Sequence, residues 1–313
     1  MPTVLVTRPL PEGAMRTLAS ALDVRRGPEP LDVPGLHAAV KGCDGIVCLL
    51  TERIDGPLLD AAGPSLKVVA NVAVGYDNID LAAAKARGVV VTNTPNVLTN
   101  ATAELTWALI LAITRRIGEG ERLLRDGRWK GWALDFMTGM ELAGKQLGVV
   151  GAGRIGRAVA ARAGVFGMNV AFADVTVGAE LDGHPVIPLD ALVATADVLT
   201  LHVPLTPETR HLINQALLER MKPTAYLVNT SRGPVVDESA LAWALKSGVI
   251  AGAALDVFER EPIVHADLLG LENAVLVPHI GSATRETRAA MADLAARNAV
   301  AVLTGGTAIT PVT

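Results

Sequence analysis

The chain has 313 residues, of which half are hydrophobic and 19% are charged, and its formal net charge is −4. At about 150 residues per domain this length predicts two domains, and the composition is typical of a globular protein with a large core. The net charge is small and no long run of charges of one sign occurs, which disfavours nucleic acid and membranes as partners. The sequence shows neither a signal-peptide pattern nor a stretch of about 18 consecutive apolar residues, so we expect a cytoplasmic protein.

The first hundred residues alternate between two kinds of pattern. Apolar runs typical of strands buried on both faces occur at 3–7, 45–50, 66–75 and 89–95, with helical stretches at 11–21 and 81–88. This alternation predicts a parallel sheet flanked by helices. Cys43 and Cys48 lie in this region without a CxxC or histidine companion, so neither a disulfide framework nor a metal site is predicted.

Residues 94–100 interrupt the alternation and read as a connection. We expect Asn100 to cap a long helix after it. The apolar stripe of that helix recurs at helical spacing and comprises Leu105, Ala108, Leu109, Ala112 and Ile113. An Arg/Gly-rich stretch over 115–131 then ends the apolar run.

A second series of β-rich runs follows, at 145–153, 168–174, 197–204, 225–230, 252–257 and 274–279. A last helix over about 284–303 has no domain after it, so we expect it to pack on the first domain. The predicted fold is α/β, with two Rossmann-like domains, one flavodoxin-like and one dinucleotide-binding, that have parallel sheets and a cleft between them. The chain is expected to cross between the domains twice, so the first domain is predicted to comprise residues 1–98 and 286–313, and the second residues 99–285.

The segment GAGRIG carries glycines 151, 153 and 156 in the G-x-G-x-x-G pattern. It follows a predicted strand and opens a predicted helix, which is the context that the motif requires. Gly151 permits the tight turn, Gly153 lets the backbone approach a pyrophosphate, and Gly156 allows close helix–strand packing. The alternative is a glycine turn without a ligand, which other α/β proteins also contain.

Asp174 ends the next predicted strand, about 20 residues further on. A carboxylate there accepts hydrogen bonds from ribose hydroxyls and repels a 2′-phosphate, and the residues that follow include no Arg or Lys. We therefore expect NAD(H) rather than NADP(H).

Arg232, Glu261 and His279 each come just after a predicted strand of the second domain. Arginine binds a carboxylate in bidentate fashion, a histidine can protonate a carbonyl oxygen, and a carboxylate behind the imidazole stabilises its charged form. This set suits the reduction of a 2-oxo acid. Taken singly, Arg232 could be a surface ion-pair residue, Glu261 a solvated acid and His279 a core histidine. Their spacing in the sequence does not show that they meet in the fold.

Seven motifs occur in order along the chain: AVGYDNIDL, TNTPNVLTNATAELTWALIL, GVVGAGRIGRAVA, LHVPLTPETRHLI, VNTSRGPVVDESAL, GAALDVFEREP and PHIGSATRETR. With them the chain resembles the D-isomer-specific 2-hydroxyacid dehydrogenase family over nearly its whole length. The resemblance implies that Arg232, Glu261 and His279 are the catalytic trio, with Arg232 and His279 in contact with the substrate.

The resemblance also implies binding roles for residues that carry no signal of their own. It implies that the backbone of Val74 and Gly75 holds the substrate carboxylate, with Leu50 and Thr51 nearby. The implied cofactor contacts, beside the glycines and Asp174, are Thr102, Arg154, Ile155, His202, Pro204, Thr230, Asp256 and Gly281. His202 and Pro204 could instead only shape a loop, and Asp256 could only cap a strand end.

Within the family the motifs look most similar to those of glyoxylate/hydroxypyruvate reductases. Such reductases often use NADPH with Arg or Lys after the second strand, whereas this chain has Asp174 there. A phosphoglycerate- or D-lactate-type dehydrogenase, and an NAD-sensing corepressor, stay as alternatives.

Aromatic residues are only 3% of the chain, yet Trp129, Trp132, Phe136 and Met137 cluster between the long helix and the dinucleotide strand. Such a concentration indicates a surface that becomes buried. In the family the corresponding arm wraps a second subunit, so the resemblance implies a homodimer. The alternative is that these side chains belong to the core of one domain.

Overall fold

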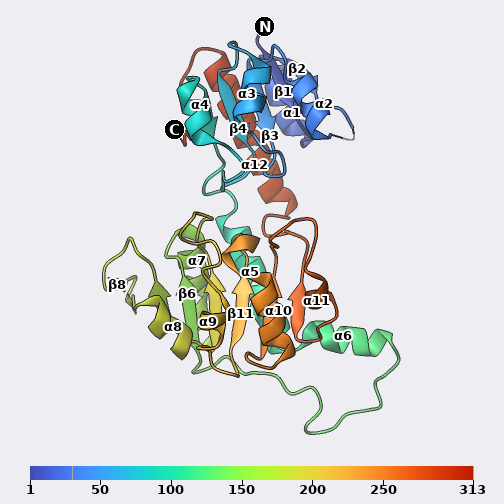
Figure 1. Ribbon diagram of the computed structural model, residues 1–313, viewed down its shortest axis with the longest axis vertical. Coiled ribbons are helices and arrows are strands. Elements are labelled where there is room, and N and C mark those ends of the chain that lie inside the picture. The colour runs from blue at the N-terminus through green and yellow to red at the C-terminus, as the bar shows by residue number, and fades with distance from the viewer. Residues whose placement is uncertain (30, 313) are drawn as a thin grey trace. The chain divides into compact units, whose positions relative to one another are not determined.

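The computed structural model describes residues 1–29 and 31–312, and the chain divides into two compact units (Figure 1). Unit 1 comprises Met1–Leu98 and Ser282–Thr313, and unit 2 comprises Thr99–Gly281. Each unit contains a parallel sheet with helices packed against it. The fold class predicted from the sequence is therefore confirmed.

Unit 1 has a five-stranded sheet in the order β2-β1-β3-β4-β5, in which all paired strands are parallel. Its strands are β1 (Thr3–Val6), β2 (Asp23–Arg26), β3 (Gly45–Cys48), β4 (Val68–Asn71) and β5 (Val90–Thr92). Every residue of β3 and β4 is buried, as expected for strands covered on both faces. The strand order reverses between β1 and β3, and ligands of open α/β sheets bind at the carboxyl ends beside such a reversal.

The helices of unit 1 are α1 (Glu12–Ala19), α2 (Val33–Ala39), α3 (Gly56–Ala62), α4 (Leu81–Ala86) and α12 (Arg285–Leu303). Aspartate side chains cap α2, α3 and α4, and Thr284 caps α12, because each accepts a hydrogen bond from an N–H in the first turn. Helix α12 packs against α1, β3 and β4. Its residues Met291, Leu294, Ala295 and Ala299 are buried.

Unit 2 has a six-stranded parallel sheet in the order β13-β12-β11-β10-β6-β7. Its strands are β6 (Gln146–Val150), β7 (Asn169–Ala173), β10 (Val198–Leu201), β11 (Tyr226–Asn229), β12 (Gly252–Leu255) and β13 (Ala274–Leu276). A short antiparallel pair, β8 (Glu180–Leu181) and β9 (His184–Pro185), lies outside this sheet. Here the order reverses between β6 and β10.

The helices of unit 2 are α5 (Thr99–Thr114), α6 (Ile117–Arg125), α7 (Arg154–Ala163), α8 (Leu189–Thr195), α9 (Gln215–Leu218), α10 (Glu238–Lys246) and α11 (Ala266–Leu269), with 3-10 turns η1 (Gly164–Phe166) and η2 (Gly233–Val235). No helix among residues 1–29 and 31–312 is long and apolar enough to cross a membrane.

Two expectations for α5 were wrong. The helix begins at Thr99, so Asn100 lies inside its first turn rather than capping it, and its Oδ1 accepts a hydrogen bond from Arg162 Nη2 at 3.2 Å. Ala108 is exposed, whereas Trp107 and Ile110 are buried. A helix that is apolar on most sides does not reveal its buried face by periodicity alone.

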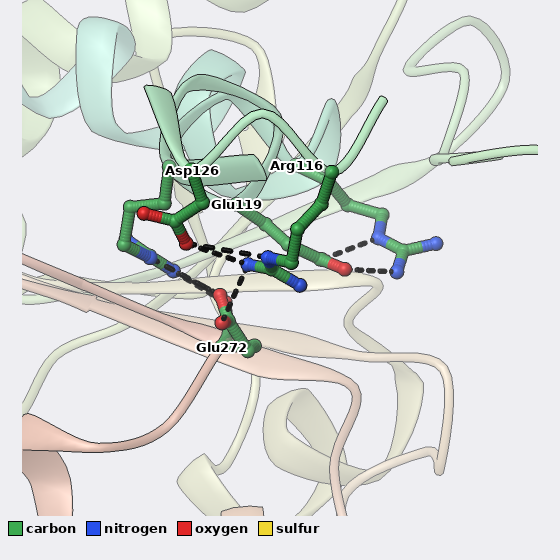
Figure 2. A network of polar contacts seen from close by, with 6 residues as sticks. Arg116, Glu119, Asp126 and Glu272 are labelled. Carbon is green, nitrogen blue, oxygen red and sulfur yellow. Dashed lines mark hydrogen bonds and ion pairs between the residues drawn. The ribbon is translucent and has the colours of Figure 1, made fainter. Parts of the chain in front are cut away.

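Helix α6 lies within the stretch where no helix was expected. None of its residues is buried, and its three apolar side chains stand among two glycines and four charged residues, so no apolar run marks the helix in the sequence. An ion pair links it to the residues before β13, because Arg122 Nη2 lies 2.7 Å from Glu272 Oε2. Arg116, directly before the helix, pairs with Glu119 in its first turn (Figure 2). Exposed pairs of this kind contribute little stability, so the position of α6 depends on weak contacts.

Candidate active site

The glycine turn follows β6 at the point where the strand order of unit 2 reverses. Gly151 has φ +95°, and a Cβ on it would lie 2.6 Å from the carbonyl oxygen of His202, which follows β10. A Cβ on Gly156 would lie 2.1 Å from the carbonyl oxygen of Gly151. Both positions therefore exclude side chains, and the turn brings the ends of β6 and β10 together as the motif predicts.

Gly153 is the N-cap of α7, and Arg154 and Ile155 form the first turn of that helix. No side chain caps this terminus, and no atom lies within 4 Å of the position that a Cβ on Gly153 would take. The first N–H groups of a helix lack partners within the helix and favour an anion. This terminus therefore fits the pyrophosphate of a dinucleotide.

Asp174 directly follows β7 and ties that strand to the glycine turn. Its Oδ2 accepts a hydrogen bond from Ala152 N at 2.7 Å, and its Oδ1 accepts from Thr176 N and Oγ1 at 2.7 and 2.6 Å. Burial alone would raise the pKa of Asp174, but these three donors lower it overall. The carboxylate therefore keeps its negative charge beside the turn.

The predicted trio follows three neighbouring strands of unit 2 at their carboxyl ends, and two of its members are in contact. Arg232 follows β11, Glu261 follows β12 and His279 follows β13. Nδ1 of His279 lies 2.8 Å from Oε2 of Glu261, and Oε1 of Glu261 accepts a hydrogen bond from Phe258 N at 3.0 Å. Because this contact uses Nδ1, Nε2 is the ring nitrogen left for a substrate.

The charges around Glu261 favour its ionised form. Burial acts to raise the pKa of Glu261, but the hydrogen bond and charge of His279, the Phe258 N–H and the charge of Arg232 lower it overall. Glu261 is thus an anion in contact with His279, with the charge of Arg232 acting on it. A carboxylate in this position stabilises an imidazolium and holds the orientation of its ring.

Asp256 holds the backbone that carries His279. Its Oδ1 and Oδ2 accept hydrogen bonds from Ile280 N and Gly281 N at 2.6 and 2.8 Å, and its own carbonyl accepts from His279 N at 2.8 Å. His279 adopts φ +50° in this turn. Thr102 Oγ1 donates to the carbonyl of Gly281 at 3.3 Å. Three of the implied cofactor residues are therefore neighbours here.

The remaining implied cofactor residues also follow strands of this sheet. Thr230, after β11, shares a hydrogen bond of 2.9 Å with Thr106 through their hydroxyls. His202 Nε2 lies 2.9 Å from Thr200 Oγ1, and burial lowers the pKa of His202 to about 3. Its Nδ1 is buried without a partner among the described residues. Pro204 accepts a hydrogen bond from the Thr209 hydroxyl in the same loop.

Two residues that shape the site were not predicted. Asn229 Nδ2 donates to the carbonyl of Arg232 at 2.9 Å, while its Oδ1 accepts from Ser231 N at 3.0 Å. A Cβ on Gly233 would lie 1.9 Å from the carbonyl carbon of Phe258, so this glycine lets the Arg232 turn reach the Glu261 segment. The signal was present in the sequence NTSRG, since an asparagine at a strand end often forms a side-chain turn.

The implied substrate residues of unit 1 also follow strands at a carboxyl edge. Leu50 and Thr51 follow β3, and Val74 and Gly75 follow β4. Directly after Thr51 comes Glu52, a buried carboxylate that sequence reasoning missed. Its two oxygens accept hydrogen bonds from four groups: Thr7 Oγ1, Arg8 Nε, Leu49 N and Thr51 Oγ1, at 2.7 to 3.1 Å.

In the part of the chain that the structure describes, no three His, Cys, Asp or Glu side chains gather as metal ligands would. Cys43 and Cys48 are both buried free thiols, and burial raises the pKa of each. Neither thiol is therefore activated as a nucleophile.

Comparison with known proteins gives consistent matches. A family model described as "D-isomer specific 2-hydroxyacid dehydrogenase, NAD binding domain" matches residues 107–281. The glyoxylate reductase of Thermococcus onnurineus is 47% identical over 97% of this chain and 93% of that protein.

Solved structures agree with this match. A protein from Thermus thermophilus is 47% identical and superimposes with a TM-score of 0.93 over 99% of this chain and 100% of that one. An NADPH-dependent glyoxylate/hydroxypyruvate reductase from Sinorhizobium meliloti, in complex with NADP and malonate, is 38% identical. It superimposes with a TM-score of 0.89 over 100% of this chain and 97% of that one. This chain therefore belongs to the D-isomer-specific 2-hydroxyacid dehydrogenase family and is an oxidoreductase.

Proposed function

We propose that this enzyme uses NADH to reduce small 2-oxo acids, such as glyoxylate and hydroxypyruvate, to 2-hydroxy acids. The observation that carries the proposal is the 2.8 Å contact between His279 and Glu261, in the unit that also contains the glycine turn. A proton donor and a dinucleotide site together suit the addition of a hydride and a proton to a carbonyl group. The similarity to proteins named glyoxylate reductase supports the substrate class.

The proposed reaction divides the chemistry between the cofactor and the protein. When bound, NADH supplies the hydride. As the carbonyl carbon of the substrate accepts it, negative charge develops on the carbonyl oxygen, and Nε2 of the His279 imidazolium donates its proton there. Glu261 stabilises the imidazolium before this transfer. Arg232 binds the substrate carboxylate and fixes the orientation of the carbonyl group.

We assign substrate binding to Leu50, Val74 and Gly75 of unit 1 in addition to Arg232 and His279. The backbone N–H groups of Val74 and Gly75 are the proposed carboxylate ligands. In this assignment residues 1–98 and 286–313 form the substrate domain and residues 99–285 bind NAD.

We assign cofactor binding to the glycine turn, Asp174 and the residues that surround Asp256 and His202. Two features favour NADH over NADPH. The negative charge of Asp174 opposes a 2′-phosphate, and the adjacent residues Val175, Thr176 and Val177 offer no cation to hold one. The relative from Sinorhizobium meliloti, by contrast, is named NADPH-dependent.

The test is a panel of 2-oxo acids assayed for oxidation of NADH and of NADPH by absorbance. We expect turnover of glyoxylate and hydroxypyruvate, with a higher kcat/KM for NADH than for NADPH. The absence of turnover with every 2-oxo acid would refute the proposed reaction, and a preference for NADPH would refute the role given to Asp174.

We also propose that the enzyme is a homodimer. Trp129, Trp132, Leu134 and Phe136 are exposed in the segment after α6, with 81% of Trp132 and 84% of Leu134 accessible. This exposure contradicts the alternative that the tryptophans and Phe136 belong to a domain core. A second copy of the chain would remove this apolar surface from water. Light scattering should give twice the chain mass, and a monomer at micromolar concentration would contradict the proposal.

A further inference from the structure

We propose that Asn71 and Asn93 are positioning residues that fix the two peptide groups on either side of Gly75. This inference rests on the proposed function, which assigns the Val74–Gly75 backbone to binding of the substrate carboxylate. The residues concerned all lie in unit 1, at the carboxyl ends of β4 and β5.

The two asparagine amides hold the carbonyl groups before and after the Gly75 α-carbon. Asn93 Nδ2 donates to the carbonyl oxygen of Val74 at 2.7 Å, and Asn71 Nδ2 donates to that of Gly75 at 2.9 Å. In addition, Thr94 N donates to the carbonyl oxygen of Ala73 at 2.8 Å. Three consecutive carbonyl groups are therefore each held by a different donor of the fold.

Holding a carbonyl group also sets the direction of the next N–H. A trans peptide group is planar, so its C=O and its N–H point in opposite directions. The contact from Asn93 therefore sets the direction of the Gly75 N–H, and the contact from Thr94 sets that of the Val74 N–H; these are the two proposed carboxylate ligands. The contact from Asn71 sets the direction of the neighbouring Tyr76 N–H. Among the described residues, none of these three N–H groups donates to a protein acceptor. Each points away from the donor that holds its peptide group and is available to an anion.

The contacts from Asn71 and Asn93, together called the clamp, act where the backbone would otherwise be most mobile. Glycine has more backbone freedom than any other residue, and fixing it in one conformation has the largest entropy cost. With both flanking peptide groups held before the substrate arrives, less of that cost falls on binding. The asparagines therefore should affect how tightly the carboxylate binds rather than the rate of the chemical step.

Each asparagine is itself held by neighbouring residues. Asn71 is fully buried, and its Oδ1 accepts from Cys48 Sγ and Asn78 Nδ2 at 3.5 and 3.4 Å, which restrains rotation of its amide. The backbone carbonyl of Asn93 accepts from the Thr310 hydroxyl at 2.6 Å, and that hydroxyl accepts from Asn298 Nδ2 of α12 at 2.8 Å. The C-terminal segment thus holds the backbone of Asn93.

The decisive variant is Asn93→Leu, which removes the amide donor at similar size without adding a charge. We expect the KM for glyoxylate and the inhibition constant of oxalate to rise together by roughly tenfold, as for the loss of one well-made hydrogen bond. The KM for NADH and the kcat should change less than twofold. A variant that only loosens the fold would change the constants for both substrates.

Two further variants make the test specific. Asn273→Leu is the matched control, because Asn273 is half-buried and its Nδ2 also donates to backbone carbonyls, those of Leu245 and Ala251, but at the start of β13. It should leave the KM for glyoxylate unchanged. Thr310→Val keeps Asn93 and removes its support, so it should raise the same KM by a smaller factor.

The outcomes separate the clamp from the proposed function. No turnover by the unmodified enzyme would refute the function and, with it, the clamp. Turnover with an unchanged KM for glyoxylate in Asn93→Leu, or with equal rises for glyoxylate and NADH, would refute the clamp and leave the function in place. If Asn93→Leu does not fold by circular dichroism, Thr310→Val decides by the same criterion.

Discussion

The two units carry their candidate functional groups in different ways. In unit 2 the groups are the side chains of Arg232, Glu261 and His279, which follow three strand ends. His279 contacts Glu261, and the charge of Arg232 acts on the same carboxylate. In unit 1 they are backbone N–H groups around Gly75, and the side chains of Asn71 and Asn93 hold that backbone by donating to its carbonyl groups. The comparison predicts that unit 2 controls the chemical step and unit 1 controls affinity for the substrate.

His279→Ala should have the largest effect, because it removes the proposed proton donor from unit 2. General acids contribute about 10²–10⁴-fold to a rate, and we expect a loss of kcat on the order of 10³-fold. Steady-state kinetics with glyoxylate measures this loss. The fluorescence of bound NADH should show nearly unchanged cofactor affinity, and a larger loss of kcat in Asp174→Ala would reverse the roles assigned here.

Glu261→Gln should lower the rate without abolishing it. The carboxylate contacts Nδ1 of His279 and holds the imidazole ring, and the amide keeps the size of the side chain but loses its charge. We expect a loss of roughly 10–100-fold in kcat/KM, measured by steady-state kinetics with glyoxylate. An unchanged kcat/KM would remove Glu261 from the proton transfer.

Asp174→Ser should change the choice of cofactor without changing the chemistry. The variant loses the negative charge and the partner of Ala152 N, so the KM for NADH should rise by roughly tenfold, while that for NADPH should fall. Initial rates with both cofactors measure the ratio. A variant with the same preference as the parent enzyme would place cofactor selection elsewhere.

Glu52→Gln tests unit 1 through its stability. Glu52 is 5% exposed, and its carboxylate accepts four hydrogen bonds. In the variant an amide NH₂ group replaces one oxygen, so hydrogen-bond donors of the protein that pointed at that oxygen would face another donor. We expect the free energy of unfolding to fall by about 1–3 kcal/mol in urea. Glu12→Gln is the control, since Glu12 pairs with Arg16 on the surface, and the two variants should differ clearly.

His202 should produce a smaller effect that depends on pH. Its pKa is about 3 in the folded chain against 6.5 for the free side chain, so below pH 6.5 the unfolded chain binds a proton that the folded chain does not. Stability should therefore fall as the pH is lowered from 6.5 towards 3. Urea unfolding at about pH 7 and about pH 4.5 should show a smaller loss in His202→Gln than in the parent enzyme.

The same contrast explains what the sequence could predict. Strands buried on both faces, the glycine turn and the grouping of Glu261 with His279 were all predicted, because apolar runs and reactive side chains leave local patterns. Helix α6 was not, since it buries no residue and its few apolar side chains stand among glycines and charged residues. Asn71 and Asn93 contact backbone carbonyls, and the partners of Glu52 lie up to 45 residues away. No local pattern records such contacts.

The most direct test of the proposed chemistry is to follow the hydride itself. Hydroxypyruvate can be reduced with NADH that carries deuterium at C4 of the nicotinamide, on either face in separate experiments, and the product analysed by mass spectrometry and chiral chromatography. We predict D-glycerate with deuterium at C2 from one of the two labelled forms. Product without deuterium from either form, or the L-isomer, would contradict hydride transfer by this site.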